Sequence, residues 1–307
     1  KETVINSATF LAIENPSTDV ARYRAGDLDM TNYGLPPEQF AKLQKELPGE
    51  VYITRTLATY SYELNNKKAP FDNVNIRKAL NLSLDRNVIT DKVLGQGQTP
   101  TYVFTPTYIE EGHLIQQPAY SKEPMAQRNE EAIKLLEEAG YSKANPLKFS
   151  ILYNTNENHK KVAIAAASMW KANTKGLIDV KLENQEWKTY IDSRRAGRYD
   201  AARAGWNADY NQATTFGNYF LSNSSNNTAK YANPEYDKAI AESYVATDAE
   251  GRAKAYAKAE EILAKDFGIV PIFNYVNPRL VKPYVKGYSG KDPQDHIYLR
   301  NLYIIKH

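Results

Sequence analysis

A β-rich run begins with Val51-Tyr52-Ile53-Thr54-Arg55-Thr56-Leu57-Ala58-Thr59-Tyr60-Ser61-Tyr62 and continues to Asn65 in this chain of 307 residues. Its β-branched and aromatic residues favour an extended strand. Strands in globular proteins usually span only about 5 or 6 residues. The run is therefore long enough to pass from one region of sheet into another, in a chain whose length suggests about two domains.

Helix and strand signals alternate on both sides of this run. Asn15 is expected to cap a helix that has Pro16 in its first position and ends at Gly26. A capping box is expected at Thr247-Asp248-Ala249-Glu250, with the Thr and Glu side chains bound to amides at the helix start. Further helices are expected at residues 37–47, 74–82, 86–94, 129–139, 159–173, 187–195, 234–245 and 249–266. Strands are expected at residues 3–13, 28–32, 51–65, 148–153, 178–182, 199–205, 269–275, 280–281 and 298–305. The alternation predicts an α/β fold.

Composition excludes several classes of partner. Hydrophobic residues make up 42% of the chain and charged residues 24%, which argues against disorder. The formal net charge is +3, and Lys and Arg are interleaved with Asp and Glu, so no basic stripe points to nucleic acid. No apolar run approaches the roughly 18 to 20 residues of a membrane span. Cysteine is absent, which excludes disulfides, thiolate metal ligands and a cysteine nucleophile.

Catalytic motifs are missing as well. The sequence contains no G-x-S-x-G elbow, H-E-x-x-H helix or P-loop, and Gly95-Gln96-Gly97 lacks the third glycine of a dinucleotide fingerprint. The four histidines are scattered, and none has metal-ligand spacing. We therefore expect no catalytic residue, no metal and no cofactor, and a protein that is not an enzyme.

The stretch from residue 184 to residue 210 is rich in side chains that bind ligands. It holds two of the three Trp residues and ends in Ala204-Gly205-Trp206-Asn207-Ala208-Asp209-Tyr210. A strand that ends here offers backbone amides at its edge, and Gly205 allows another main chain to come close. An extended peptide could add to such an edge, with Asp209 pairing with its ammonium group. The alternative is that Trp187 and Trp206 are core residues and that Asp209 caps the following helix.

Two blocks carry a resemblance to a known family. They are Phe71-Asp72-Asn73-Val74-Asn75-Ile76-Arg77-Lys78-Ala79-Leu80 and Ala202-Arg203-Ala204-Gly205-Trp206-Asn207-Ala208-Asp209-Tyr210-Asn211, with weaker matches at residues 62–66, 152–155, 184–188, 221–225 and 276–283. Over essentially its whole length the chain resembles the periplasmic oligopeptide-binding proteins of ABC importers, within the peptide/nickel class of extracellular solute-binding proteins. The second block points to the oligopeptide subgroup.

The resemblance implies a periplasmic-binding-protein-like two-lobe fold of class II, whose lobes close on the ligand. Family members are longer, so the chain resembles their C-terminal portion. Residues 1–57 are expected to be part of the first lobe and residues 58–276 to be the second lobe with the ligand-binding face. Residues 277–307 are expected to return to the first lobe as strands. The second lobe is thus expected to be complete and the first partial.

The resemblance also implies function and location. A protein of this kind is expected to bind short peptides largely independently of their sequence and to deliver them to the membrane subunits of an ABC importer. It is expected to act as a monomer in the periplasm, and nucleic acid is not an expected partner. The start, Lys1-Glu2-Thr3-Val4, has no apolar signal-peptide core, so the export signal is expected to lie outside this chain.

Residue roles carry over from the family to matching positions. Asp209 is implied to bind the ligand α-ammonium, and Gly205, Asn207 and Tyr275 to bind the ligand main chain. Arg203 and His159 are implied to be cations that receive the ligand carboxylate, with Asn154 nearby. The implied linings of roomy side-chain pockets are Trp187, Trp206, Arg194 and Asn226.

Two departures and two alternatives remain. Asn207 replaces a Cys of some relatives at a main-chain contact, and the loop at residues 171–177 resembles the family less well because it is longer.

A narrower receptor of the same class, for a murein tripeptide or for haem, is one alternative. A peptide hydrolase with Asp192 and Asp209 as acid and base is the other, and the missing nucleophile argues against it.

Overall fold

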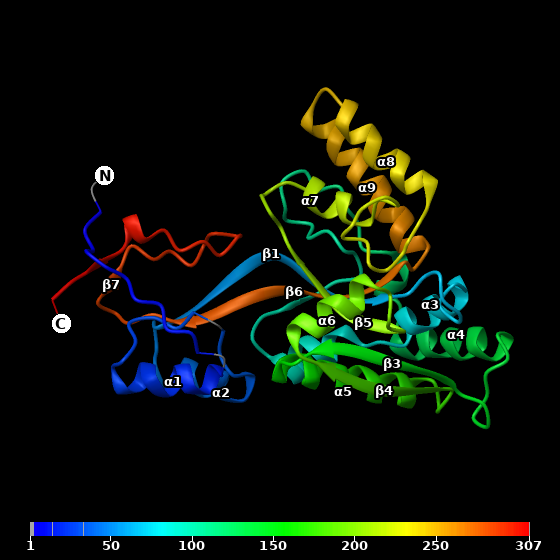
Figure 1. Cartoon of the computed structure of the whole chain (residues 1–307), viewed down its shortest axis with the longest axis horizontal. Coiled ribbons are helices and arrows are strands. Elements are labelled where there is room, and N and C mark those ends of the chain that lie inside the picture. Colours follow the sequence, from blue (N-terminus) through cyan, green and yellow to red (C-terminus); the bar gives the residue numbers. More distant parts are fainter. Residues whose placement is uncertain (1–2, 14, 33, 307) are drawn as a thin grey trace. The chain divides into compact units, whose positions relative to one another are not determined.

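The computed structural model describes residues 3–13, 15–32 and 34–306, and it divides the chain into two compact units (Figure 1). The smaller unit comprises Lys1–Thr56, Leu94–Gln98 and Tyr275–His307, and the larger unit comprises Leu57–Val93 and Thr99–Asn274. Strands β1 (Val51–Leu64) and β6 (Ile269–Leu280) each have residues in both units. The long run at residue 51 therefore does pass from one unit into the other, as its length predicted.

A six-stranded sheet organises the larger unit, with the strand order β2-β6-β1-β5-β3-β4. Its other strands are β2 (Thr99–Pro100), β3 (Leu147–Asn154), β4 (Ile178–Gln185) and β5 (Ala201–Asn207). β3 pairs with β4 and with β5 in parallel, whereas β5 pairs with β1 antiparallel. The sheet is therefore mixed, and the predicted α/β class is confirmed.

Helices pack on this sheet through apolar side chains. The helices of the larger unit are α3 (Val74–Leu82), α4 (Met125–Glu138), α5 (Glu157–Asn173), α6 (Trp187–Arg195), α7 (Thr214–Gly217), α8 (Pro234–Val245) and α9 (Ala249–Lys265). Shorter turns are a π-helix at Val88–Leu94 and 3-10 helices at Ala119–Lys122 and Asn218–Phe220. Trp170 of α5 is fully buried, and its indole donates to the Leu80 carbonyl of α3 at 2.9 Å. On α6, Tyr190 packs with Leu152 of β3 and Ala202 of β5.

The smaller unit has its own core. Helices α1 (Pro16–Ala25) and α2 (Pro37–Glu46) bury Tyr23, Phe40 and Leu43 against Leu280 of β6. Strands β7 (Val285–Lys286) and β8 (Tyr303–Ile304) form a two-stranded sheet, with a 3-10 helix at Leu299–Asn301. The side chain of Asn15 caps α1 through the Ser17 amide, and Gly26 ends it at a φ of 87°, which glycine adopts without strain. Both predicted signals are confirmed.

Three sequence predictions were wrong in detail. Residues 3–13 form no strand, and residues 28–32 contribute only the single bridge from Met30 to Val281. Residues 298–305 contain a 3-10 turn and only the two-residue strand β8. A strand persists only where it has a partner to bond with, and the sequence pattern does not reveal that partner.

A fourth correction concerns the start of α9. The cap is Asp248, whose carboxylate accepts from the Gly251 amide at 2.6 Å, and not Thr247. An N-cap side chain binds the amide two or three residues ahead, so moving the cap by one residue replaces Glu250 by Gly251 as its partner.

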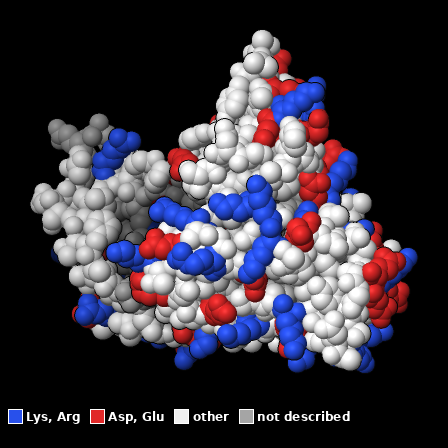
Figure 2. All heavy atoms as spheres, turned by 45° about the vertical axis from the view of Figure 1, so that its right-hand side comes forward, with Lys and Arg blue, Asp and Glu red and all other residues white. Residues whose placement is uncertain are grey.

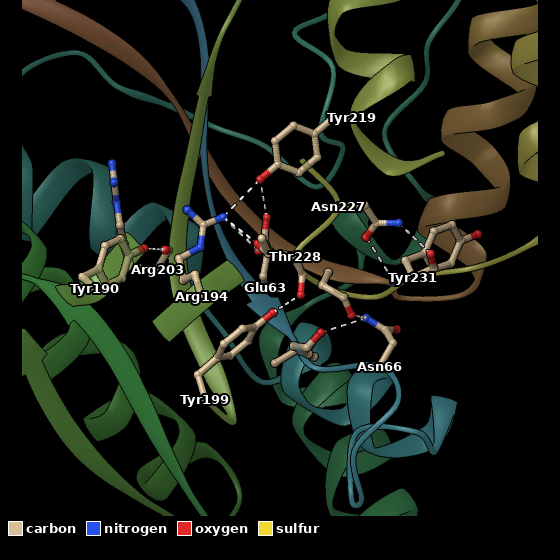
Figure 3. A network of polar contacts seen from close by, with 12 residues as sticks. Glu63, Asn66, Tyr190, Arg194, Tyr199, Arg203, Tyr219, Asn227, Thr228 and Tyr231 are labelled. Atoms are coloured by element: carbon tan, nitrogen blue, oxygen red, sulfur yellow. Dashed lines mark hydrogen bonds and ion pairs between the residues drawn. The ribbon is translucent and has the colours of Figure 1, made fainter. Parts of the chain in front are cut away.

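A buried ion pair joins several elements of the larger unit (Figure 3). Arg194 of α6 reaches Glu63 of β1 at 2.9 Å, and their side chains are 10% and 1% exposed. Tyr219 donates to the other Glu63 oxygen at 2.6 Å, and the Thr228 hydroxyl donates to the oxygen that Arg194 contacts. Burial acts to lower the pKa of Arg194, but the charge of Glu63, the nearby Tyr219 and Tyr190 and the hydrogen bond to Glu63 together outweigh burial and raise that pKa well above its usual range. Arg194 is therefore charged at neutral pH.

Replacing Arg194 by Met should destabilise the protein by about 3 to 5 kcal/mol, because it leaves the Glu63 carboxylate buried without a counter-charge. The measurement is the free energy of unfolding from urea denaturation. Arg195→Met is the matched control, since Arg195 is exposed on the same helix and should cost less than about 0.5 kcal/mol. Equal effects of the two substitutions would contradict this account of the network.

Candidate functional site

Strand β5 has an open edge, and the register of the sheet shows which groups lie on it. Ala208 donates to the Leu57 carbonyl at 2.8 Å, and Asn65 donates to the Asp200 carbonyl at 3.1 Å. Hydrogen-bonded pairs alternate in an antiparallel ladder. The main-chain N–H and C=O groups of the even-numbered residues of β5 therefore bond to β1, and those of the odd-numbered residues face the opposite side of the strand. On that outer side β3 pairs only with Ala201 and Ala202. The main-chain groups of Gly205 and Asn207 therefore face a side on which no strand of the described chain pairs with them.

Tyr190 closes one end of this edge. Its hydroxyl donates to the carbonyl of Arg203, which is the odd-numbered residue before Gly205 (Figure 3). Trp187, at the start of α6, lies with its ring 5.8 Å from that of Tyr190 and is 55% exposed. The core alternative for Trp187 is thus wrong, because more than half of its surface is accessible.

Asp209 lies directly beyond the other end of the edge and is linked to Trp206 through Thr215. The Thr215 hydroxyl accepts from the Trp206 indole and from the Asp209 amide, each at 3.2 Å, and donates to Asp209 Oδ2 at 3.1 Å. Trp206 is half-buried, with its ring 4.9 Å from that of Tyr219. Helix α7 has Ala213 at its N-cap without a side-chain bond, so the alternative that Asp209 caps this helix is also wrong.

A second cluster contains Arg203, Tyr60 and His159. The Arg203 guanidinium lies 5.1 Å from the centre of the Tyr60 ring, and the His159 ring lies 5.6 Å from it. Burial, and then the neighbouring Arg203 charge, lower the pKa of His159 to about 2. The imidazole is therefore neutral at pH 7 in the structure described, and the expectation that His159 receives a ligand carboxylate stays a prediction.

The remaining predicted residues are placed in different surroundings. Asn154 ends β3 and is about nine-tenths buried, whereas Asn226 is exposed in the loop before Thr228. Arg194 is turned inward to Glu63, so its first role is structural. Tyr275 belongs to the smaller unit, where its carbonyl accepts from the Thr56 hydroxyl at 3.1 Å.

Surface charges are mixed in sign, and the described residues contain no group of side chains arranged to hold a metal ion. Lys and Arg side chains lie among Asp and Glu side chains over the face drawn in Figure 2. Among residues 3–13, 15–32 and 34–306, no three acidic or His side chains are grouped as metal ligands, and no helix has the length and apolarity to cross a membrane.

Several residues of this face were not singled out from the sequence. No motif marks Thr215, Tyr190 or Tyr219. Each lies in a different element from its main partner, which is Asp209 for Thr215, Arg203 for Tyr190 and Glu63 for Tyr219. Tyr60 carried a weak signal, because it lies two residues before the matched segment at residue 62. The 23 Tyr residues of the chain are a compositional hint that some of them have such roles.

Replacing His159 by Gln should make stability less sensitive to acid. The unfolded state has a histidine pKa of about 6.5 and binds a proton below that pH, whereas the folded state does not until about pH 2. Stability from neutral His159 is therefore lost as the pH falls below about 6.5, by at most about 1.4 kcal/mol per pH unit. The free energy of unfolding, measured at pH 7 and pH 5, should fall less in His159→Gln than in the parent. The exposed His113→Gln serves as control, and a fall as large as the parent's in His159→Gln would refute the assignment.

Comparison with known proteins gives the family. The model of bacterial extracellular solute-binding proteins, family 5 Middle, matches residues 1–228. The chain is 97% identical over 307 residues to the periplasmic oligopeptide-binding protein OppA of Haemophilus influenzae, covering all of this chain and 57% of that protein. It is 43% identical over 306 residues to the periplasmic murein peptide-binding protein MppA of Escherichia coli, covering all of this chain and 56% of that protein.

Comparison with solved structures gives the same family. The crystal structure of Haemophilus influenzae OppA in complex with the peptide RPPGFSPFR matches with a TM-score of 0.93 at 96% identity, covering 99% of this chain and 59% of that chain. This chain thus spans a little more than half the length of these relatives. The predicted resemblance is confirmed, and the chain belongs to the family 5 bacterial extracellular solute-binding proteins, with the α/β fold of periplasmic binding proteins.

Proposed function

We propose that this chain supplies one wall of a receptor that binds oligopeptides largely independently of their sequence and releases them unchanged. One observation carries the proposal: the main-chain groups of Gly205 and Asn207 face an unpaired side of β5, next to the Asp209 carboxylate. Main-chain bonding to a sheet edge gives affinity without reading ligand side chains. The relatives named for oligopeptide binding support the same function.

The wider setting is part of the proposal. The receptor is expected to work in the periplasm, in line with the relatives' names. It is also proposed to act as a monomer and to deliver peptides to the membrane subunits of an ABC importer. We propose that residues 1–57 and 277–307 belong to a partial first lobe and residues 58–276 to the second. Because the relatives are longer, the opposing wall of the site is expected to come from sequence outside these 307 residues.

Residue roles follow from position and charge. Asp209 is proposed to bind the ligand ammonium, and Gly205, Asn207 and Tyr275 its main chain. Side-chain pockets are proposed beside Trp187, Trp206, Arg194 and Asn226, and the ligand carboxylate beside Arg203, His159 and Asn154. The neutral His159 would act there as a hydrogen-bond donor, and Arg203 would supply the charge.

The narrower receptors are the main alternative. The murein peptide-binding relative is 43% identical, against 97% for the oligopeptide-binding one, which favours oligopeptides. The test uses the joined protein, in which this chain is completed by the rest of the Haemophilus influenzae relative. Native mass spectrometry of the freshly purified joined protein should reveal peptides of mixed mass. A single bound mass, such as a murein tripeptide or haem, would overturn sequence-independent binding, and cleavage of labelled peptides would point to the hydrolase.

Asp209→Asn should weaken binding of peptides with a free amino group by about 2 to 5 kcal/mol, because it removes one partner of a charge-assisted pair. N-acetylated peptides carry no charge there, so their affinity should change little. Calorimetry on the joined protein measures both, with Asp192→Asn as the control because Asp192 is an exposed carboxylate on α6. An equal loss for both kinds of peptide would sink the proposed role of Asp209.

A further inference from the structure

Thr215 uses every hydrogen-bonding position of its hydroxyl. A hydroxyl has one proton to donate and two lone pairs that accept. The indole of Trp206 and the amide of Asp209 are obligate donors, and both point at Thr215 Oγ1 at 3.2 Å. The single proton is therefore directed to Asp209 Oδ2, which lies at 3.1 Å. One side chain thus fixes both the indole and the carboxylate.

The segment around Thr215 is itself firmly held. Thr215 is 4% exposed, and its amide donates to the carbonyl of Gln212 at 3.3 Å. The Gln212 side chain donates to Glu111 at 2.5 Å and to the Tyr256 hydroxyl at 3.1 Å. Glu111 in turn pairs with Arg252 of α9 at 2.6 Å. The hydroxyl is thus tied to the body of the larger unit, although Asp209 itself is exposed.

An exposed carboxylate without such support loses rotational freedom when it captures a ligand. Immobilising a side chain on binding lowers affinity, and a group that is already oriented avoids this cost. The order along the chain matters too, because Asn207 ends the open edge and Asp209 lies two residues beyond it. Holding Trp206 and Asp209 together sets the place where a ligand's first residue can lie.

We infer that Thr215 is a positioning residue that orients Asp209 and Trp206 together and thereby sets the preference for peptides with a free α-ammonium. The inference rests on the proposed function, in which Asp209 binds that ammonium. Thr215 does not contact the ligand in this account. It acts through the direction of its hydroxyl proton.

The test compares Thr215→Val, which keeps the shape and removes the hydroxyl, with Thr215→Ser, which keeps the hydroxyl. The ligands are tri-alanine and N-acetyl-tri-alanine, and calorimetry on the joined protein gives the ratio of their affinities. Thr215→Val should lower the affinity for tri-alanine by about 3- to 10-fold more than that for the acetylated peptide, because only tri-alanine depends on the orientation of Asp209. Thr215→Ser should restore the parent ratio.

Thr214→Val is the matched control. Thr214 is the neighbouring buried threonine, but its hydroxyl contacts Tyr256 at 3.1 Å and neither Asp209 nor Trp206. Its loss should leave the ratio unchanged. In an Asp209→Asn background, Thr215→Val should have no further effect on the ratio.

The outcomes separate the two claims. If Asp209→Asn changes the ratio and Thr215→Val does not, the role of Thr215 is refuted while the proposed function stands. If Thr215→Val lowers the affinity for both peptides equally, or still changes the affinity ratio in the Asp209→Asn background, the role of Thr215 is only structural. If Asp209→Asn does not change the ratio, the ammonium site fails, and the inference with it. Should Thr215→Val not fold, hydrogen exchange of the Trp206 indole N–H in the parent decides, because exchange as fast as that of an exposed indole is incompatible with the bond to Thr215.

Discussion

Glu63 carries a carboxylate into the interior of the larger unit, and the elements around it are arranged to satisfy that charge. A buried carboxylate is tolerated only with a counter-charge and hydrogen bonds. Arg194, Tyr219 and Thr228 provide them, and they come from α6, from the 3-10 helix at Asn218–Phe220 and from the loop that follows it. Satisfying one buried group on β1 thus holds three segments of the larger unit together.

The open edge follows from this arrangement. Because Arg194 fixes α6 against β1, Tyr190 of the same helix is held where its hydroxyl meets the Arg203 carbonyl. β3 no longer pairs with β5 beyond Ala202, so no strand of the described chain pairs with the outer main-chain groups of Gly205 and Asn207. Nearly every peptide residue carries the same amide and carbonyl, so an edge that offers only such contacts does not select among sequences.

Much of the fold could be predicted from local sequence signals, whereas contacts between distant segments could not. The long strand at residue 51 and the capped helix at Asn15 depend on neighbouring residues alone, and both are present. The strand expected at residues 3–13 needed a partner elsewhere. In the candidate site, Trp206 and Asp209 were found because they are close in sequence. Arg194 was expected at a pocket because of the family resemblance. Its ion pair with Glu63 was not predicted, because Glu63 lies 131 positions away and gives no signal beside it. Thr215 was missed because only the turn before α7 brings its hydroxyl back to Asp209.

The charged side chains at the two ends of the edge distinguish one end from the other, which main-chain contacts alone do not do. Residues 203 and 207 are four positions apart, which is about 13 Å along an extended strand. Asp209 lies beyond one end, and Arg203 lies at the other beside His159, which burial and then the Arg203 charge keep neutral. In the proposed function, a peptide bound along this edge would place its ammonium near Asp209 and run toward Arg203. Orientation would then come from the ligand's terminal charges and adhesion from its main chain, so neither would depend on the peptide's side chains.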